Sequence, residues 1–248
     1  MVARVLVVVL TLAMISAAAA QTSAPTPAQA ARALIARYDQ DPSRLDRARD
    51  LLETALKDER RVDTLITLSF VYFMLGEIRA RSADEKLAAY DRGRELGKRA
   101  VELAPRDEEA HLWYAINTGR WGQTKGVLRS LFLLSTVREE IEIILALNPT
   151  SARGRALAGN VLMEVPAFAG GDRQKAEDQF RRGIEHDPHF TALRVDLARL
   201  LIAAGRQDEA RQQLTRVLEE KTPTNVADWN AKDRPRAREL LESLRDKK

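Results

Sequence analysis

The sequence predicts an all-α fold, a solenoid of about five stacked antiparallel helix pairs with a capping helix at the C-terminus. The composition fits such a fold, because 45% of the residues are hydrophobic but only 5% are aromatic. The 9 prolines and 12 glycines gather between apolar segments rather than within them. Apolar residues recur at helical spacings in successive segments, and helices of this kind bury their apolar stripes only by stacking.

One complete unit, Thr191 to Pro223, shows the pattern of each pair most clearly. Its signature positions are a large-small residue pair, a glycine at the turn and three apolar positions on the second helix: Leu197 and Ala198, Gly205, and Ala210, Leu214 and Val217. The small residues let two antiparallel helices approach closely, while the leucines fill the space between them. This is the pattern of the tetratricopeptide repeat, whose period is about 34 residues. The expected fold is therefore a tetratricopeptide-repeat α-solenoid.

Three successive earlier units carry extra residues between their two helices. The extra segments, each of which contains glycine, are 76–86, 119–126 and 166–172. Equivalent turns of a stacked array project on one side, so we expect three inserted loops that form one continuous surface. Asp172, at the end of the last segment, is well placed to cap the helix that follows.

The N-terminus predicts an exported protein. Residues 1–20 hold one basic residue, Arg4, then an apolar run from Val5 to about Ile15 and a stretch of small residues. This is the organisation of a secretory signal peptide, with cleavage expected before Gln21. The alternative, an uncleaved membrane anchor, needs about 18 or more apolar residues. The expected location is the periplasm or the outside of the cell.

The mature chain is expected to divide into a flexible leader at 21–28, the solenoid at 29–223 and a charged C-terminal cap at 224–248. It contains no cysteine, which argues against a lipid attachment at the cleavage point and against a disulfide framework. No later segment is long and apolar enough to span a bilayer, so we expect no stable membrane anchor. The 40 basic and 36 acidic residues intersperse along the chain, which indicates a solvated surface and no nucleic-acid partner.

The concave side of such an array is lined by fixed positions on the first helix of each pair. Here these positions supply Ile66, Phe70, Phe73, Met74, Leu112, Ile116, Arg120, Asn160, Met163, Glu164, Val195, Arg199 and Ile202. An apolar groove with a few polar groups suits an amphipathic helix of a partner or a small apolar ligand. The alternative is that Phe70, Phe73 and Met74 pack against the N-terminal helix of the chain itself.

Several motifs resemble those of a known family. They are His111 to Ala115, Gly119 to Gly122, Lys125 with Gly126, Pro149, and Glu164 to Ala176. Over about Ala89 to Leu218 the chain resembles the T-component family of bacterial TRAP-transporter accessory proteins. The resemblance implies a periplasmic tetratricopeptide protein that can oligomerise and engages a TRAP solute-binding protein. It also implies a role in passing on a hydrophobic or organic-acid ligand. The lipoprotein cysteine of that family is absent from this sequence.

The residues show no pattern of a catalytic or metal site. His186 and His189 flank an Asp-Pro pair, as the turn between two units would place them, and His111 has no partner nearby in the sequence. The glycine-rich segment 119–126 lacks the order of a phosphate-binding loop, and neither Gly-x-Ser-x-Gly nor a cysteine nucleophile occurs. We therefore expect no enzyme, no cofactor and no metal ion. An enzyme would need an acid-base pair in the folded groove.

The function predicted from the sequence is non-catalytic binding of a protein partner. Besides the groove residues and Trp113, the inserted segments are expected to supply Asn117, Arg120, Trp121, Lys125 and Phe168. Trp113 and Trp121 have two interpretations, as packing anchors or as ligand platforms. Arg120 and Lys125 pair either with an anionic ligand or with nearby glutamates. A general cell-envelope scaffold and a carrier of a small apolar ligand stay open as alternatives, and a homo-oligomer is compatible with each.

Overall fold

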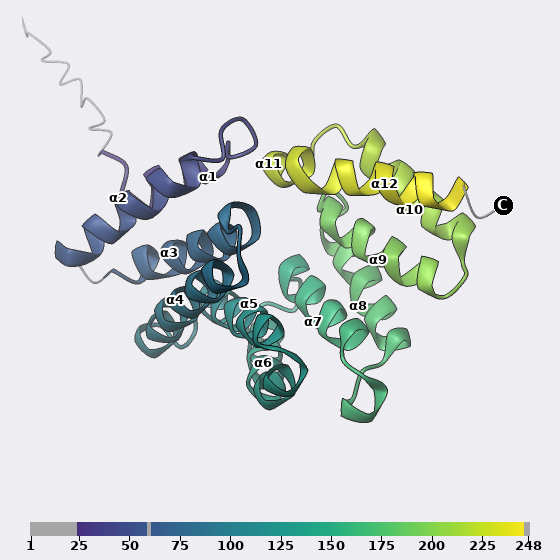
Figure 1. The fold of residues 1–248 in the computed structure, drawn as a ribbon, viewed down its shortest axis with the longest axis horizontal. Helices are drawn as coiled ribbons and strands as arrows, with labels where there is room; N and C mark the ends of the chain where they lie inside the picture. Colours follow the sequence, from purple (N-terminus) through teal and green to yellow (C-terminus); the bar gives the residue numbers. More distant parts are fainter. Residues whose placement is uncertain (1–23, 59–60, 246–248) are drawn as a thin grey trace, which may run out of the picture.

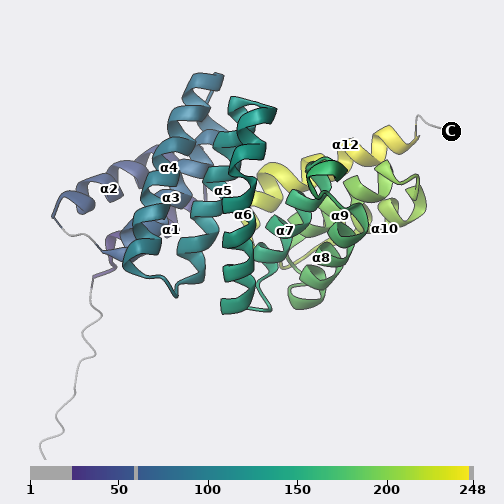
Figure 2. The ribbon, with the colours of Figure 1, turned by 90° about the horizontal axis from the view of Figure 1, so that it is seen from below.

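The computed structural model describes residues 24–58 and 61–245, which form helices and turns without any strand. The helices pair as α1 (Pro27–Ile35) with α2 (Arg44–Asp58), α3 (Val62–Met74) with α4 (Ala83–Leu103), α5 (Glu108–Lys125) with α6 (Val127–Leu147), α7 (Ala152–Glu164) with α8 (Arg173–His186), and α9 (Thr191–Ala203) with α10 (Gln207–Glu219). Figures 1 and 2 show these pairs stacked into a curved solenoid. The all-α solenoid is confirmed. The predicted signal peptide lies outside the described residues.

A C-terminal segment follows the fifth pair. It consists of α11 (Val226–Asp228), the π-helical turn η3 (Trp229–Asp233) and α12 (Arg234–Arg245). The buried Ala237 and Leu244 join α12 to the core beneath α10, and the indole N–H of Trp229 donates to the Val217 carbonyl at 2.7 Å. In Figure 1, α11 lies next to α1, so the end of the solenoid returns to its beginning.

The hydrophobic core has two large parts and a small one between them. The first lies among α1 to α5 and includes the fully buried Leu65 and Leu96. The second lies among α8, α9, α10 and α12 and includes Phe180 and Leu214. Complete burial of such a side chain stabilises the fold by roughly 1.5–3 kcal/mol. The small part, where α6 meets α7, consists of Val137, Ile141 and Ala158.

The first helix starts earlier than the predicted boundary between leader and solenoid. Thr26 accepts a hydrogen bond from the Gln29 amide at 3.2 Å, while the Gln29 side chain accepts one from the Thr26 amide at 2.9 Å. This capping box satisfies two backbone donors that a helix otherwise leaves unpaired, and Pro27 fits the first helical position because its φ is fixed. Residues 27 and 28, expected in the leader, therefore belong to α1.

The extra residues of the second and third units lengthen helices instead of forming the expected loops. α4 and α6 have 21 residues each and α5 has 18, against 13 in α9. Segment 76–86 runs from the π-helical turn η1 (Leu75–Arg79) through a short connection at 80–82 into α4, and 119–125 belongs to α5. Gly126, with φ at 109°, separates α5 from α6. The segment at 166–172 does form a connection, which contains the 3-10 turn η2 (Ala167–Ala169).

Two buried hydrogen bonds connect α3, α4 and α5. The side-chain amide of Asn117 donates to the Ser69 carbonyl at 3.1 Å, and the Ser69 hydroxyl donates to the Gly93 carbonyl at 2.7 Å. The helices approach closely at this level, because a Cβ on Gly97 would lie 2.8 Å from the Tyr114 backbone. Asn117 is 0% exposed, so this residue, predicted to recognise a partner, holds the interior together.

Candidate functional site

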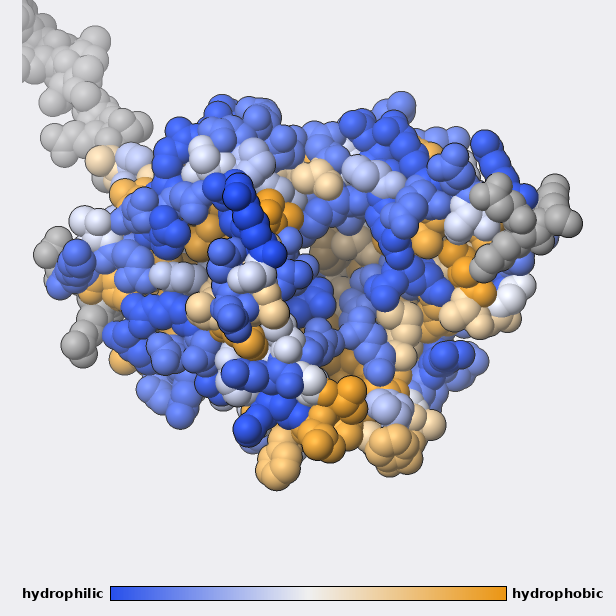
Figure 3. Space-filling model, viewed as in Figure 1, coloured by the Kyte–Doolittle hydropathy of each residue, from blue (hydrophilic) through white to orange (hydrophobic). Residues whose placement is uncertain are grey.

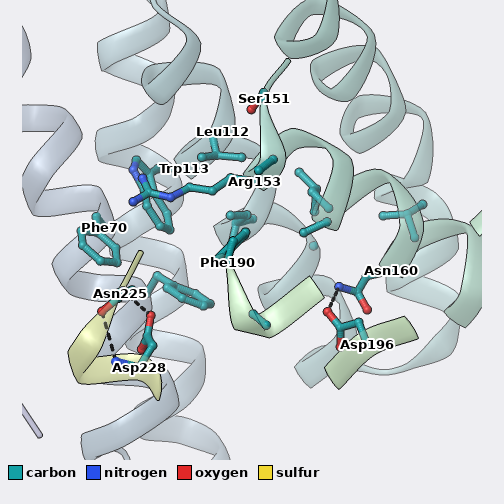
Figure 4. A pocket seen from close by; sticks show the side chains of 18 of the residues that line it. Phe70, Leu112, Trp113, Ser151, Arg153, Asn160, Phe190, Asp196, Asn225 and Asp228 are labelled. Atoms are coloured by element: carbon teal, nitrogen blue, oxygen red, sulfur yellow. Dashed lines mark hydrogen bonds between the residues drawn. The ribbon is translucent and has the colours of Figure 1, made fainter. Parts of the chain in front are cut away.

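A cavity of about 670 Å³ lies on the concave side of the solenoid. The first helices of four successive pairs, α3, α5, α7 and α9, line it together with the C-terminal segment. Figure 3 shows this hollow at the centre of the face seen in Figure 1, and Figure 4 shows its lining from close by. We name it the central cavity.

One wall of the central cavity is aromatic and apolar. Phe70 on α3 stacks on Trp113 on α5, with ring centres 4.2 Å apart and planes inclined by 22° (Figure 4). Phe73 lies 5.7 Å from the same indole, and Leu112 and Ile116 extend this wall along α5. Trp113 is 5% exposed, which means that it anchors the core and presents only a small part of its ring to the cavity. We name these five residues the aromatic wall.

A charged contact connects the aromatic wall to α7. The guanidinium of Arg153 lies 5.9 Å from the centre of the Trp113 ring and forms an ion pair of 3.1 Å with Glu109. Arg32 of α1 reaches the same carboxylate at 2.6 Å. Burial opposes ionisation of Glu109, but the two arginines outweigh it and lower the pKa of this carboxyl.

The opposite side of the central cavity is polar and acidic. The Asn160 side chain on α7 donates to Asp196 on α9 at 2.8 Å (Figure 4), and Arg199 donates to the other carboxylate oxygen at 3.1 Å. Burial raises the pKa of Asp196, although these two donors favour its charged form. Within the described residues the buried Oδ1 of Asn160 has no hydrogen-bond partner.

The C-terminal segment forms one side of the central cavity. Asp228 of α11 accepts a hydrogen bond from the Tyr38 hydroxyl at 2.7 Å and another from the Asn225 side chain at 2.6 Å. Asn230 donates to Asp39 at 2.9 Å beside this contact. Burial and the nearby Asp228 carboxylate raise the pKa of Tyr38, so its phenol stays protonated and remains a donor.

A further buried carboxyl joins this side of the cavity. Asp233 of η3 accepts a hydrogen bond from the Thr191 hydroxyl at 2.7 Å, and it is 8% exposed. Burial raises its pKa to about 6, against the opposing effect of the Thr191 donor. Asp187, Asp196, Asp228 and Asp233 all line the cavity. In Figure 4, Asp196 lies across the cavity from Phe70 and Trp113, whereas Asp228 lies on the side of Phe70. We name these four residues the acidic wall.

Ten of the eighteen residues predicted to bind a partner or ligand line the central cavity. These are Phe70, Phe73, Met74, Leu112, Trp113, Ile116, Arg120, Asn160, Glu164 and Arg199. Phe70 and Phe73 also pack against the core that contains α1, so both interpretations of these residues hold in part. Arg120 forms an ion pair of 3.3 Å with Glu77, the glutamate pairing that was one of its two interpretations.

The other eight predicted residues lie away from the central cavity. Ile66, Val195 and Ile202 pack in the two large parts of the core. Asn117 is buried among three helices, as described above. Trp121 and Lys125 lie in a cluster in which Arg94 is 4.7 Å and Lys125 5.7 Å from the indole centre. Met163 packs against the second core. Phe168 on η2 is 86% exposed.

Several cavity residues are not among the predicted ones. Asp228 and Asp233 come from a segment that the sequence predicts to be a charged cap, and Arg153 and Phe190 lie at the starts of first helices. Asp196 does have a signal in the sequence, because it follows the predicted groove position Val195 directly and is the acidic residue of a mainly apolar helix.

The described part of the chain contains no group of three or more His, Asp and Glu side chains arranged to hold a metal ion. His111 is buried against Glu140 at 2.5 Å, between α5 and α6. In the cavity, Glu164 lies 3.9 Å from Arg199 and accepts a hydrogen bond from Gln123 at 2.7 Å.

The fold and its concave cavity define a tetratricopeptide-repeat protein, and a family model of this repeat matches residues 167–229. A second family model, described as regulator of microtubule dynamics protein 1-3, matches residues 28–168, which is more than half of the chain. The chain belongs to this family. The resemblance to the T-component family finds no support in these comparisons.

The curated relatives carry the same family name. Regulator of microtubule dynamics protein 3 of Rattus norvegicus is 25% identical over 193 residues, which cover 71% of this chain and 40% of the relative. The protein of Bos taurus is 23% identical over 185 residues, covering 68% and 39%. The chain thus spans about 40% of the length of these relatives.

Among solved structures, a thermophilic TPR protein of Thermus thermophilus aligns with a TM-score of 0.66 at 23% identity. The alignment covers 87% of this chain and 97% of that one. At this level of identity the likeness establishes the shared solenoid fold.

Proposed function

We propose that the chain is a non-catalytic interaction module that binds a short segment of a partner protein in the central cavity. The observation that carries the proposal is one cavity lined by four first helices and the C-terminal segment, whose lining combines the aromatic wall with the carboxylates of the acidic wall. Tetratricopeptide solenoids use their concave surfaces for binding, which agrees with this position.

The chemistry of the lining defines the kind of segment. Its charged side chains are Glu108, Glu109, Glu164, Asp187, Asp196, Asp228 and Asp233 against Arg120, Arg153, Arg199 and Lys232. Carboxylates therefore outnumber cations, and complementarity favours a segment with a basic side chain. The aromatic wall adds a place for an apolar side chain of the same segment.

An array of short peptides tests this function directly. Apolar and basic side chains are varied independently, and the array is probed with the full chain. We expect retention of peptides that carry both kinds of side chain, and less retention when the basic residue becomes neutral. Equal retention of all peptides, or a preference for acidic ones, would contradict the proposal.

A carrier of a small ligand is the second candidate, and the size of the cavity favours it. A volume of about 670 Å³ falls within the range of pockets for small molecules, roughly 300–1,000 Å³. Mass spectrometry of a solvent extract of the purified protein separates the two functions. A stoichiometric small molecule supports the carrier, and its absence leaves the peptide-binding module.

Narrower roles are separate proposals. Engagement of a TRAP solute-binding protein in the periplasm rests on the motifs between Ala89 and Leu218, and titration with a purified solute-binding protein tests it.

Regulation of microtubule dynamics rests on the family name, and co-sedimentation with assembled microtubules tests that role. The periplasmic location rests on residues 1–20, and N-terminal sequencing of the protein from its native cells would show whether cleavage occurs before Gln21.

A further inference from the structure

An exposed apolar edge lies at the beginning of α6 and on η2. Val127 is 70%, Leu128 82%, Phe132 81% and Phe168 86% exposed. Figure 3 shows apolar surface gathered along the lower edge of the molecule, where α6 and η2 lie in Figure 1. None of these four residues lines the central cavity. We name them the apolar edge.

The two parts of the apolar edge are held together. The guanidinium of Arg138 on α6 donates to the Ala169 carbonyl of η2 at 2.8 Å. Gly170, with φ at 87°, ends this turn directly beside the same guanidinium, because a Cβ there would lie 2.7 Å from it. The turn that carries Phe168 is therefore fixed against α6, and the exposed phenylalanines belong to one surface.

The start of α6 and the turn before it carry basic but no acidic side chains. From Gly122 to Arg138 the chain has three basic residues, Lys125, Arg129 and Arg138, and the next acidic residues are Glu139 and Glu140. Lys125 and Arg129 are exposed and lie 5.7 Å and 5.9 Å from the centre of the Trp121 ring. Tryptophan flanked by cations beside exposed leucine and phenylalanine is the arrangement that amphipathic surfaces present to a membrane interface.

We propose that the apolar edge docks on the surface of an anionic phospholipid bilayer. Val127, Leu128, Phe132 and Phe168 enter the boundary between headgroups and acyl chains, while Lys125 and Arg129 contact the anionic headgroups. No helix within residues 24–58 and 61–245 has the length and apolar composition to cross a bilayer, so the contact is peripheral. This inference goes beyond the proposed function and stands independently of it.

Vesicle binding of the full chain tests the proposal. Because the chain has no cysteine, Ser135→Cys places an environment-sensitive fluorophore on the exposed face of α6. Vesicles of phosphatidylcholine with about 30% phosphatidylserine are compared with phosphatidylcholine alone. We expect a blue shift of the fluorophore with anionic vesicles, weakened by salt. Ser243→Cys on α12, labelled in the same way, should show no shift.

Variants of the edge give the second readout, measured with the same fluorophore. Leu128→Ser with Phe132→Ser should weaken vesicle binding by more than about 10-fold, since both side chains are exposed and make the apolar contact. Leu103 lies outside the apolar edge and is 56% exposed. The Leu103→Ser variant should therefore bind vesicles as the unaltered chain does. Lys125→Glu with Arg129→Glu should weaken vesicle binding by about 25-fold or more, because each cation contributes a factor of about 5 to the affinity. Lys221→Glu is the matched control.

Three outcomes would overturn the proposal. One is a fluorophore at residue 135 that does not shift with anionic vesicles. Another is equal binding by the Leu128→Ser, Phe132→Ser variant. The third is lipid-free self-association in sedimentation velocity that the same variant abolishes, because the apolar edge would then be covered by a second copy of the chain.

Discussion

The hydroxyl of Tyr38, just after the first helix, donates a hydrogen bond of 2.7 Å to Asp228 in the C-terminal segment, 190 residues later in the chain. Beside it, Asn230 donates to Asp39 at 2.9 Å. A solenoid in which each unit contacts only its neighbours presents an open groove. In this protein the two ends meet, and the C-terminal segment forms an additional side of the groove, which stays open on the face seen in Figure 3.

Removing the Tyr38 hydroxyl should weaken the contact between the two ends of the chain. We expect Tyr38→Phe to lower the free energy of unfolding by about 1 kcal/mol, the usual contribution of one hydrogen bond, and to speed amide hydrogen exchange at residues 226–233. Tyr72→Phe is the matched control, because its hydroxyl donates to Glu53 at 2.8 Å, away from the C-terminal segment. Equal amide-exchange rates at 226–233 in both variants would show that the Tyr38 contact does not hold the C-terminal segment in place.

Asn117 should matter for stability. Asn117→Ala removes the donor to the Ser69 carbonyl from a site that is 0% exposed. We expect a loss of about 1–3 kcal/mol in the free energy of unfolding, measured by urea denaturation, because buried backbone groups lose their partner. Gln123→Ala, which removes an exposed hydrogen bond to Glu164, should cost less than half as much. Similar losses of stability in the two variants would contradict a structural role for the buried Asn117 hydrogen bond.

The stability conferred by Asp233 should depend on pH. Burial raises the pKa of this carboxyl from 3.8 to about 6. The folded state therefore binds the proton more tightly than the unfolded state, and the ionised form is unfavourable to folding above about pH 6. Below 3.8 both states are protonated and the effect vanishes.

Asp233→Asn isolates this effect from the other titrating groups. Its amide oxygen can still accept the Thr191 hydroxyl, so the variant should be more stable than the unaltered chain near pH 7, by up to about 3 kcal/mol. The difference should disappear at about pH 3, where the carboxyl is protonated in both states. Urea denaturation at several pH values measures it, and a difference that is constant with pH would contradict the raised pKa.

The sequence predicts the solenoid and part of the cavity for the same physical reason. A repeat with a fixed period places Leu112, Ile116 and Asn160 on the concave side wherever neighbouring units stack. The acidic residues Asp228 and Asp233 could not be found in this way, because they lie in the segment after the last repeat. Asp228 is held there by Tyr38 near the start of the chain and Asp233 by Thr191 of α9. No local pattern encodes these contacts.

The prediction of loops in the second and third units was wrong for a different reason. Gly119 and Gly122 suggest a turn in the sequence, but both lie inside α5. Gly122 is needed for packing, since a Cβ there would lie 3.2 Å from the Cα of Ser130 on α6. Among these glycines only Gly126, with positive φ, ends a helix. A glycine at a close helix contact and a glycine at a turn look alike until the partner helix is placed.

The most direct measurement is a titration of the full chain with a peptide from the array that combines apolar and basic side chains. Asp196→Asn keeps the shape of the acidic wall and the contact with Asn160 but removes one charge. We expect this change to weaken binding by about 10-fold or more, as for a lost charge-assisted hydrogen bond. Asp208→Asn, whose carboxylate is 94% exposed on α10, should leave binding unchanged. Equal affinity in the Asp196 and Asp208 variants would contradict recognition of a basic segment in the central cavity.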